Sequence, residues 1–271
     1  MPGDDDAFER MTPAAASALL KELWGLEPSE LTRLDTERDD SFRVTTADVV
    51  SVLKVAHPSD NVDTISLQVE AMDHAFEAGQ PVQRGIPTLS GAPLTIVDGR
   101  IVRMTTWLGG TRMIDAWPDI DQMREAGAAL ARLSVSLADF EHPGAHRTFP
   151  WDLQRLHDLR ELLEFSPSTA VERTIEHFER EILPRLGEVP HQVIHNDFHP
   201  GNVLVDPELP AYVVGILDFG DVLYSARIVD VAVSMAYLVT ATAPAWPAVQ
   251  PFLDGYLSVI RLTDLELEFL P

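Results

Sequence analysis

Two polar loops between short β-branched runs occupy residues 192–221 and constrain this chain more than any other feature. Asp197 and Asn202 stand five residues apart across a Pro-Gly turn, and Asp218 follows sixteen residues after Asn202. Because such a turn folds the chain back, the first two side chains can converge on one point, and Asp218 can reach it from the next hairpin. Loops of this kind commonly carry a catalytic site.

The residue types in these loops suit phosphoryl transfer. That reaction needs a carboxylate to orient and deprotonate a hydroxyl group, together with hard oxygen ligands for a magnesium ion that bridges the phosphates. Asp197, Asn202 and Asp218 supply both kinds of group.

Two other interpretations of the same segment compete with this one. His191, His195 and His199 are four residues apart and would share one helical face as zinc ligands, but the β-branched residues before them and the Pro-Gly after them oppose a helix. Asp and Asn also favour turns for their own backbone hydrogen bonds, which explains any single acid here but not the whole set.

The two loops resemble the H-x-D-x-x-x-x-N catalytic loop and the D-F-G turn of the aminoglycoside phosphotransferase and choline kinase group, which has a protein-kinase-like fold. The amino-acid sequence of these loops is most similar to that of the hydroxylysine-kinase-like branch. The resemblance implies that Asp197 is the catalytic base and that Asn202 and Asp218 are magnesium ligands. It also implies that His195 and His199 brace the loop without reacting.

Three further residues fit the same resemblance. Lys54, one of only two lysines in the chain, lies in an apolar strand, and Glu70 lies in the helix that follows. A buried ammonium group is costly unless it is paired, and in kinase-like folds such a glutamate holds a lysine on the nucleotide phosphates. Asp230, at the start of a helix, is implied to accept backbone N–H groups of the catalytic loop, and it would complement the helix dipole in any case.

The expected phosphate-covering turn, residues 34–41, departs from the usual pattern because it contains no glycine. In the hydroxylysine-kinase-like branch a polar turn takes this place, so Asp40 and Ser41 are the candidates for contact with the phosphates. Three acids, Glu37, Asp39 and Asp40, would repel ATP unless they point away from it.

The adenine-binding hinge is expected where the strand-rich half meets the helical half, at residues 104–110. Thr105 and Trp107 are its candidate nucleotide contacts. Main-chain groups would bind the base, and a sequence constrains these only weakly.

The pattern along the chain predicts an α+β fold with two lobes. Residues 1–106 form a small antiparallel sheet with one helix, and residues 107–271 form a mainly helical lobe. Strands are expected at Phe42–Thr46, Val49–Val55, Leu94–Val97, Ile101–Trp107, Gln192–Ile194, Val203–Val205 and Tyr212–Leu217. Helices are expected at Asn61–Ala78, along the stripe Ala126–Leu137, and at Leu153–Glu164, Thr169–Leu186 and Val231–Ala243.

Composition excludes several classes of function. The formal net charge of −23 opposes nucleic acids and anionic membranes, and it tolerates a cationic or zwitterionic substrate. No uncharged run approaches a bilayer span. The chain has no cysteine, which excludes disulfides and thiolate metal sites and suits a reducing cytoplasm. Asp221, Asp152 and Tyr224 are the candidate acceptor contacts.

The sequence therefore predicts a cytoplasmic kinase that uses ATP and Mg²⁺ to phosphorylate the hydroxyl of a small, amine-bearing metabolite. The alternative is a non-catalytic nucleotide-binding or scaffolding module of a longer enzyme, which the glycine-free turn favours and the intact loops oppose. The chain stops within an expected helix, so a truncated C-terminus with further domains after residue 271 is also expected.

Overall fold

The computed structural model describes residues 8–36, 38–116, 119–209, 211–241 and 246–270. Its backbone forms two compact units. The first comprises Met1–Asp73 and Gln83–Leu108, and the second comprises His74–Val82 and Gly109–Pro271. The expected lobes, residues 1–106 and 107–271, stay a prediction about which part binds the nucleotide and which part carries the catalytic residues.

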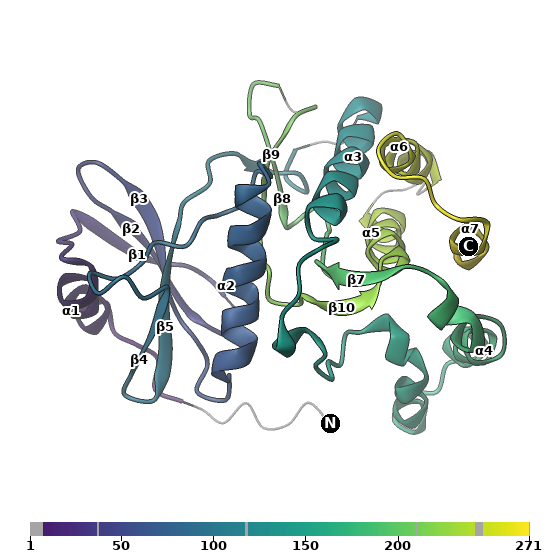
Figure 1. Cartoon of the computed structure of the whole chain (residues 1–271), viewed down its shortest axis with the longest axis horizontal. Helices are drawn as coiled ribbons and strands as arrows, with labels where there is room; N and C mark the ends of the chain where they lie inside the picture. Colours follow the sequence, from purple (N-terminus) through teal and green to yellow (C-terminus); the bar gives the residue numbers. More distant parts are fainter. Residues whose placement is uncertain (1–7, 37, 117–118, 210, 242–245, 271) are drawn as a thin grey trace. The chain divides into compact units, whose positions relative to one another are not determined.

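The first unit is built on one antiparallel sheet with the strand order β1-β2-β3-β5-β4 (Figure 1). Its strands are β1 (Glu30–Arg33), β2 (Asp40–Thr45), β3 (Val50–Val55), β4 (Leu94–Val97) and β5 (Arg100–Thr106). The tight turn between β4 and β5 uses Asp98 and Gly99, which both adopt positive φ.

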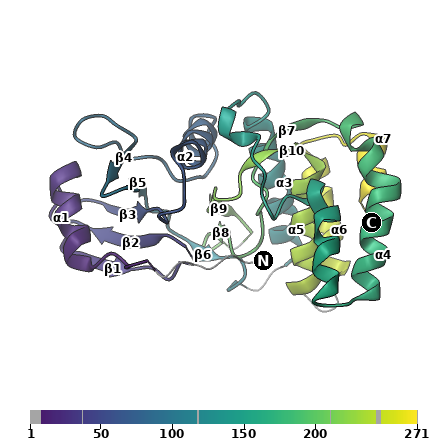
Figure 2. The same ribbon diagram turned by 90° about the horizontal axis from the view of Figure 1, so that it is seen from below.

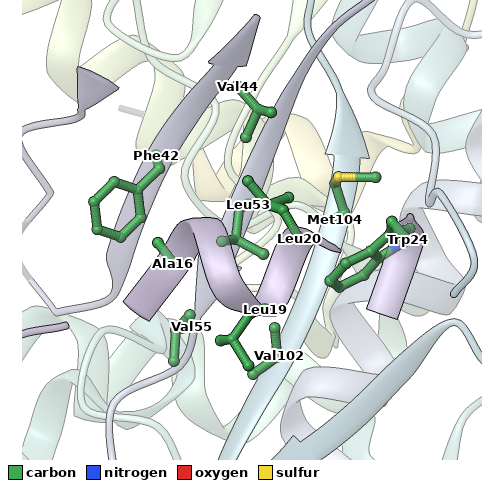
Figure 3. Packing of buried hydrophobic residues seen from close by; sticks show 10 residues of the cluster. All are labelled: Ala16, Leu19, Leu20, Trp24, Phe42, Val44, Leu53, Val55, Val102 and Met104. Carbon is green, nitrogen blue, oxygen red and sulfur yellow. The ribbon is translucent and has the colours of Figure 1, made fainter. Parts of the chain in front are cut away.

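A helix that the sequence analysis did not anticipate, α1 (Pro13–Trp24), covers one face of this sheet. Thr12 caps its first turn, proline occupies the first helical position, and Gly25 ends it with φ of 67°. Leu19, Leu20 and Trp24 pack on alternate residues of β2, β3 and β5 (Figure 3). The buried residues of this core are Ala16, Leu19, Leu20, Trp24, Phe42, Val44, Leu53, Val55, Val102 and Met104.

The expected helix after β3 is α2 (Val62–Glu77), and its residues up to Asp73 belong to the first unit. The side chain of Asn61, directly before α2, accepts a hydrogen bond from the backbone N–H of Thr64. The α2 residue Ile65 packs against Ile101, the neighbour of the core residue Val102. Because successive side chains of a strand point to opposite faces, α2 lies on the face of the sheet opposite α1.

The second unit combines two small antiparallel sheets with helices. The sheets have the strand orders β6-β8-β9 and β10-β7. The strands are β6 (Thr111–Arg112), β7 (His191–Ile194), β8 (Val203–Val205), β9 (Val213–Ile216) and β10 (Leu223–Ala226). The α-helices are α3 (Ile120–Ser136), α4 (Thr169–His177), α5 (Ile228–Ala241), α6 (Trp246–Leu257) and α7 (Asp264–Phe269).

The helix α6 packs against both α3 and α5 (Figure 2). Glycine allows the close approach of α3 and α6. A Cβ atom on Gly127 would lie 1.8 Å from the carbonyl oxygen of Phe252, and one on Gly255 would lie 1.8 Å from that of Arg124. The two backbones therefore touch where a larger residue would force them apart.

The expected mixture of antiparallel sheet and helices is present, but two of the expected helices differ from the structure. The segment Leu153–Glu164 (η2) is a 3₁₀ helix with a non-helical residue at Arg155, and the expected helix at Thr169–Leu186 ends at His177. The five residues after it form a π-helical turn (η3, Phe178–Ile182), and a 3₁₀ turn follows (η4, Leu183–Glu188), with a further one at Pro143–Ala145 (η1). Residues 242 and 243 of the expected helix Val231–Ala243 lie outside the described residues.

Within the described part of the chain, no helix has both the length and the apolar character that crossing a membrane requires.

Candidate active site

The two polar loops lie next to each other in the second unit. The strand β7 leads into the loop that begins at His195, and the hairpin of β8 and β9 leads into the turn that begins at Leu217. The backbone N–H of Leu217 donates to the carbonyl of Asn202 at 2.8 Å, which joins the turn to the loop. The turn then enters β10, where Leu223 pairs with Ile194.

Asp197 and Asn202 are in direct contact. The side-chain amide of Asn202 donates to the carboxylate of Asp197 at 2.7 Å and to its backbone carbonyl at 3.1 Å. Both acceptors are oxygen atoms, so the nitrogen of the amide must face Asp197 and its oxygen is left for another partner. The Asp197 side chain keeps about a quarter of its surface exposed.

His195 fixes both loops and is fully buried. One ring nitrogen, Nε2, lies 3.0 Å from the carbonyl of Leu217, and the backbone N–H of Asp197 donates to the other, Nδ1, at 3.3 Å. These partners require a neutral ring with its proton on Nε2. Burial lowers the pKa of His195, which also favours the neutral ring.

Asp230 holds the start of the catalytic loop. It is buried at the first turn of α5, and its two carboxylate oxygens accept the backbone N–H groups of His195 at 3.0 Å and of Asn196 at 2.6 Å. The hydrogen bonds that the resemblance implies for this residue are therefore present. Burial outweighs them and raises the pKa of Asp230 to about 7.

His199 lies beside Asp197 and is fixed by its neighbours. Its Nδ1 accepts the backbone N–H of Gly201 at 3.0 Å, its Nε2 lies 3.6 Å from the Asp197 carboxylate, and its ring stacks on Tyr237 at 4.4 Å. The zinc alternative is wrong, because His191 lies in a strand and no helix joins the three histidines. No cluster of three His, Cys, Asp or Glu side chains suited to a metal ion occurs among the described residues.

Asp218 adopts an uncommon backbone conformation with φ of 64°, and its side chain is exposed. Its carboxylate accepts the backbone N–H of Gly220 at 3.0 Å. A Cβ atom on Gly220 would lie 2.9 Å from that carboxylate, so a larger residue there would displace the Asp218 side chain. The Asp218 carboxylate and the amide oxygen of Asn202 are hard oxygen donors of the kind that Mg²⁺ prefers.

Lys54 and Glu70 belong to the first unit. Lys54 lies half-buried in β3, opposite Ser41 on one side and Arg103 on the other. Glu70 is exposed on α2 and accepts a hydrogen bond from the hydroxyl of Ser66 at 2.6 Å. Their ion pair stays a prediction.

Two acids of the expected phosphate turn, Asp39 and Asp40, lie beside arginine side chains. Asp40 is fully buried and accepts hydrogen bonds from Arg33, from Arg100 at 2.7 Å and from the backbone N–H of Met11 at 2.9 Å. Burial alone would raise the pKa of Asp40, but these three donors together lower it. The suggestion that Asp40 touches the phosphates is therefore wrong, because its carboxylate stabilises the fold of this unit.

Asp39 and Ser41 differ from Asp40 in their surroundings. The Asp39 carboxylate lies 3.2 Å from the guanidinium of Arg103, so its charge is neutralised; Glu37 lies outside the described residues. Ser41 is buried, and among the described residues its hydroxyl has no hydrogen-bond partner. It shares a face of the sheet with Lys54, its register partner on β3.

The candidate hinge residues take different roles in the first unit. The Thr105 hydroxyl is buried and accepts a hydrogen bond from the side chain of Gln83 at 3.1 Å. Trp107 keeps 37% of its surface exposed, and the guanidinium of Arg43 lies over its ring at 4.8 Å. Trp107 is thus the more accessible of the two.

The three candidate acceptor contacts also differ. Asp152 is buried and caps η2, where it accepts the backbone N–H of Gln154 at 3.0 Å. Asp221 is half-buried and lies two residues before β10. Tyr224 is 39% exposed, and its ring lies 4.5 Å from that of His146.

Two contacts from residues 147–151 to the loops were not anticipated. Arg147 donates to the carbonyl of Gly220 at 2.7 Å, and the carbonyl of Trp151 accepts the side-chain amide of Asn196 at 3.3 Å. Neither residue lies in a recognisable motif, so the sequence carried no signal for these contacts.

With this geometry in place, comparison with known proteins decides the family. Residues 30–262 match the model of the phosphotransferase enzyme family. The chain belongs to this family. The predictions of a small-molecule kinase and of a protein-kinase-like fold are confirmed.

Curated relatives of this phosphotransferase match along most of its length. Hydroxylysine kinase of Danio rerio is 27% identical over 273 residues, which cover 93% of this chain and 77% of that protein. Hydroxylysine kinase of Mus musculus is 28% identical over 291 residues, which cover 96% and 77%. The predicted likeness to the hydroxylysine-kinase-like branch is confirmed.

Solved structures share the fold at low sequence identity. An amicoumacin kinase in complex with AMP-PNP and Ca²⁺ gives a TM-score of 0.77 at 16% identity, over 97% of this chain and 82% of that one. A microcompartment-associated aminopropanol kinase gives 0.72 at 17% identity, over 95% and 84%. The comparisons lend no support to the expected further domains after residue 271.

Proposed function

We propose that this phosphotransferase uses ATP and Mg²⁺ to phosphorylate the hydroxyl of a small acceptor that carries an amine, with hydroxylysine-like amino alcohols as the first candidates. The contact between Asp197 and Asn202 is the observation that carries the proposal. It leaves one partly exposed carboxylate to take a proton and one amide oxygen to hold a metal ion.

In the proposed reaction Asp197 accepts the proton of the acceptor hydroxyl. The hydroxyl oxygen forms a bond to the γ-phosphorus, the bond from that phosphorus to the bridging oxygen breaks, and ADP leaves with the bond electrons. His195, neutral and buried, keeps Asp197 and the Asp218 turn together. Lys54, held by Glu70, is the proposed contact to the phosphates.

Asn202 and Asp218 are the proposed magnesium ligands. When bound, the ion neutralises the charge that develops on the phosphates. Asn202 presents its amide oxygen because its nitrogen is committed to Asp197, and Asp218 presents a carboxylate whose position is fixed by the backbone N–H of Gly220.

An amine-bearing acceptor is supported by charge and by the relatives. The net charge of −23 attracts a cation, and the curated relatives are named hydroxylysine kinases. Asp221 and Tyr224 are the proposed contacts to the acceptor. Asp152 is a weaker candidate because its carboxylate already caps η2. The absence of cysteine supports a cytoplasmic location.

Consumption of ATP with Mg²⁺ across a panel of amino alcohols tests the proposal, with native protein compared with Asp197→Asn. Turnover of at least one amino alcohol that is lost in the variant is expected. Nucleotide binding without turnover of any acceptor would instead favour a non-catalytic module.

A further inference from the structure

We propose that Arg147 is a positioning residue that holds the Asp218 turn in the conformation that binds the metal ion. The inference rests on the proposed function of Asp218. Its physical basis is a charge-assisted hydrogen bond of 2.7 Å from the Arg147 guanidinium to the carbonyl of Gly220, two residues after Asp218.

The turn needs such support because its backbone is strained. A non-glycine residue with φ near 64° is uncommon, and its surroundings help to hold it in that conformation. At one end of the turn, the N–H and the carbonyl of Leu217 are bound by Asn202 and His195. At the other end, the carbonyl of Gly220 is bound by Arg147.

Arg147 differs from these other partners because it comes from outside the loops that it fixes. Asn202 and His195 belong to the catalytic loop, whereas Arg147 follows η1, more than 70 residues before the turn. Its guanidinium also lies over the ring of Phe149 at 4.4 Å, which restricts its position.

The segment that contains Arg147, residues 147–151, also contacts the second residue of the site that has positive φ. Asn196, with φ of 65°, donates its side-chain amide to the carbonyl of Trp151. Only three described residues other than glycine have positive φ, and the third, Asp98, lies in the tight turn of the first unit. Residues 147–151 therefore contact the backbone or side chain of both strained parts of the site.

The experiment compares Arg147→Ala and Arg147→Lys with Arg155→Ala. Arg155 is a suitable control because it lies in the neighbouring 3₁₀ helix and forms an ion pair with Asp158, three residues further along the same helix. Hydrogen exchange in the ligand-free protein is measured first. We expect the amides of residues 218–221 to exchange about tenfold faster in Arg147→Ala and to be unchanged in Arg155→Ala.

The second measurement is the binding of AMP-PNP by calorimetry at increasing Mg²⁺. We expect Arg147→Ala to raise the half-saturating Mg²⁺ concentration by about fivefold to tenfold, with binding in the absence of Mg²⁺ unchanged. Arg147→Lys should fall between the two, since an ammonium group can still donate to the carbonyl.

Exchange and Mg²⁺ dependence that match the Arg155→Ala control would overturn the proposal. If Arg147→Ala does not fold, Arg147→Lys and Arg147→Gln give the same comparison with a donor retained. If the native protein binds no nucleotide, the proposed function fails, while the exchange measurement in the ligand-free protein still decides whether Arg147 holds the turn.

Discussion

The side-chain nitrogen of Asn202 lies 2.7 Å from the carboxylate of Asp197, so one residue orients the proposed base and presents its remaining oxygen to the proposed metal ion. Because the Asn202 side chain has these two roles, replacing its amide nitrogen with oxygen should disturb the proposed base. Asn202→Asp replaces the donor with a second carboxylate, and two like charges at this distance repel each other strongly.

We expect Asn202→Asp to lower kcat by about 10² or more, because the base loses its orienting hydrogen bond. Steady-state kinetics with a saturating acceptor checks this. Asn61→Asp is the matched control, since Asn61 caps α2 and aspartate caps a helix equally well. Equal kcat values in the two variants would contradict the role of Asn202.

Lys54 and Lys21 are the only lysines, which gives Lys54 a natural control. Lys54→Met should weaken ATP binding by about tenfold or more, because a phosphate loses its cationic partner. Lys21→Met should leave binding unchanged, since Lys21 is exposed on α1 and pairs with Glu27. Calorimetric titration of each variant with AMP-PNP measures the difference, and equal affinities would argue against a phosphate contact by Lys54.

Asp230 and His195 predict opposite effects of pH on stability. Burial raises the pKa of Asp230 to about 7, so the folded state retains a proton that the unfolded chain releases near pH 4. The free energy of unfolding contributed by Asp230 therefore falls as pH rises from about 4 to about 7. Burial lowers the pKa of His195, whose contribution is present above about pH 6.5 and is lost as pH falls.

Removing the contribution of Asp230 to the pH dependence of the free energy of unfolding should reveal the contribution of His195. In Asp230→Asn, we expect the free energy of unfolding to rise more steeply from pH 4.5 to 6.5 than in the native protein. The variant should also be about 1–3 kcal/mol less stable, because an amide nitrogen would face a backbone N–H. Urea unfolding across pH measures both effects, with the exposed Asp121→Asn as control. Parallel pH profiles would refute the assignment.

Because α3 and α6 are in backbone contact, adding a single methyl group at this contact should lower the free energy of unfolding strongly. Gly127→Ala would place a Cβ atom 1.8 Å from a carbonyl oxygen of α6, and backbone atoms cannot rotate away. We expect a loss of about 3 kcal/mol in the free energy of unfolding. Gly187→Ala, where a Cβ atom would have no neighbour within 4 Å, should change it by less than about 0.5 kcal/mol. Similar denaturation midpoints would show that the helices can separate at little cost.

The sequence was most informative where chemistry and spacing had to agree. The loop around Asp197 and Asn202 could be predicted because a turn of fixed length brings the two side chains together. The helix α1 was not predicted, although Thr12 and Gly25 mark its ends. Asp40 was misassigned because its arginine partners, from β1 and β5, come together only in the folded sheet.

Asp221 gives the sharpest test of what the acceptor is. It lies three residues after Asp218 and two residues before β10, which pairs with the strand that leads into the catalytic loop, so a carboxylate there can meet an ammonium group of the acceptor. Such a pair at 4 Å gains roughly 4 kcal/mol at an effective dielectric constant of 20, before desolvation reduces it. We expect kcat/KM for an amino alcohol to exceed that for its N-acetylated analogue, and Asp221→Asn to reduce this preference. The control is Asp254→Asn on α6, whose exposed carboxylate accepts a hydrogen bond from the side chain of Gln250; this variant should retain the preference. Indifference of the native enzyme to acetylation would defeat the cationic acceptor, whereas a preference that survives Asp221→Asn would move the contact to another residue of the second unit.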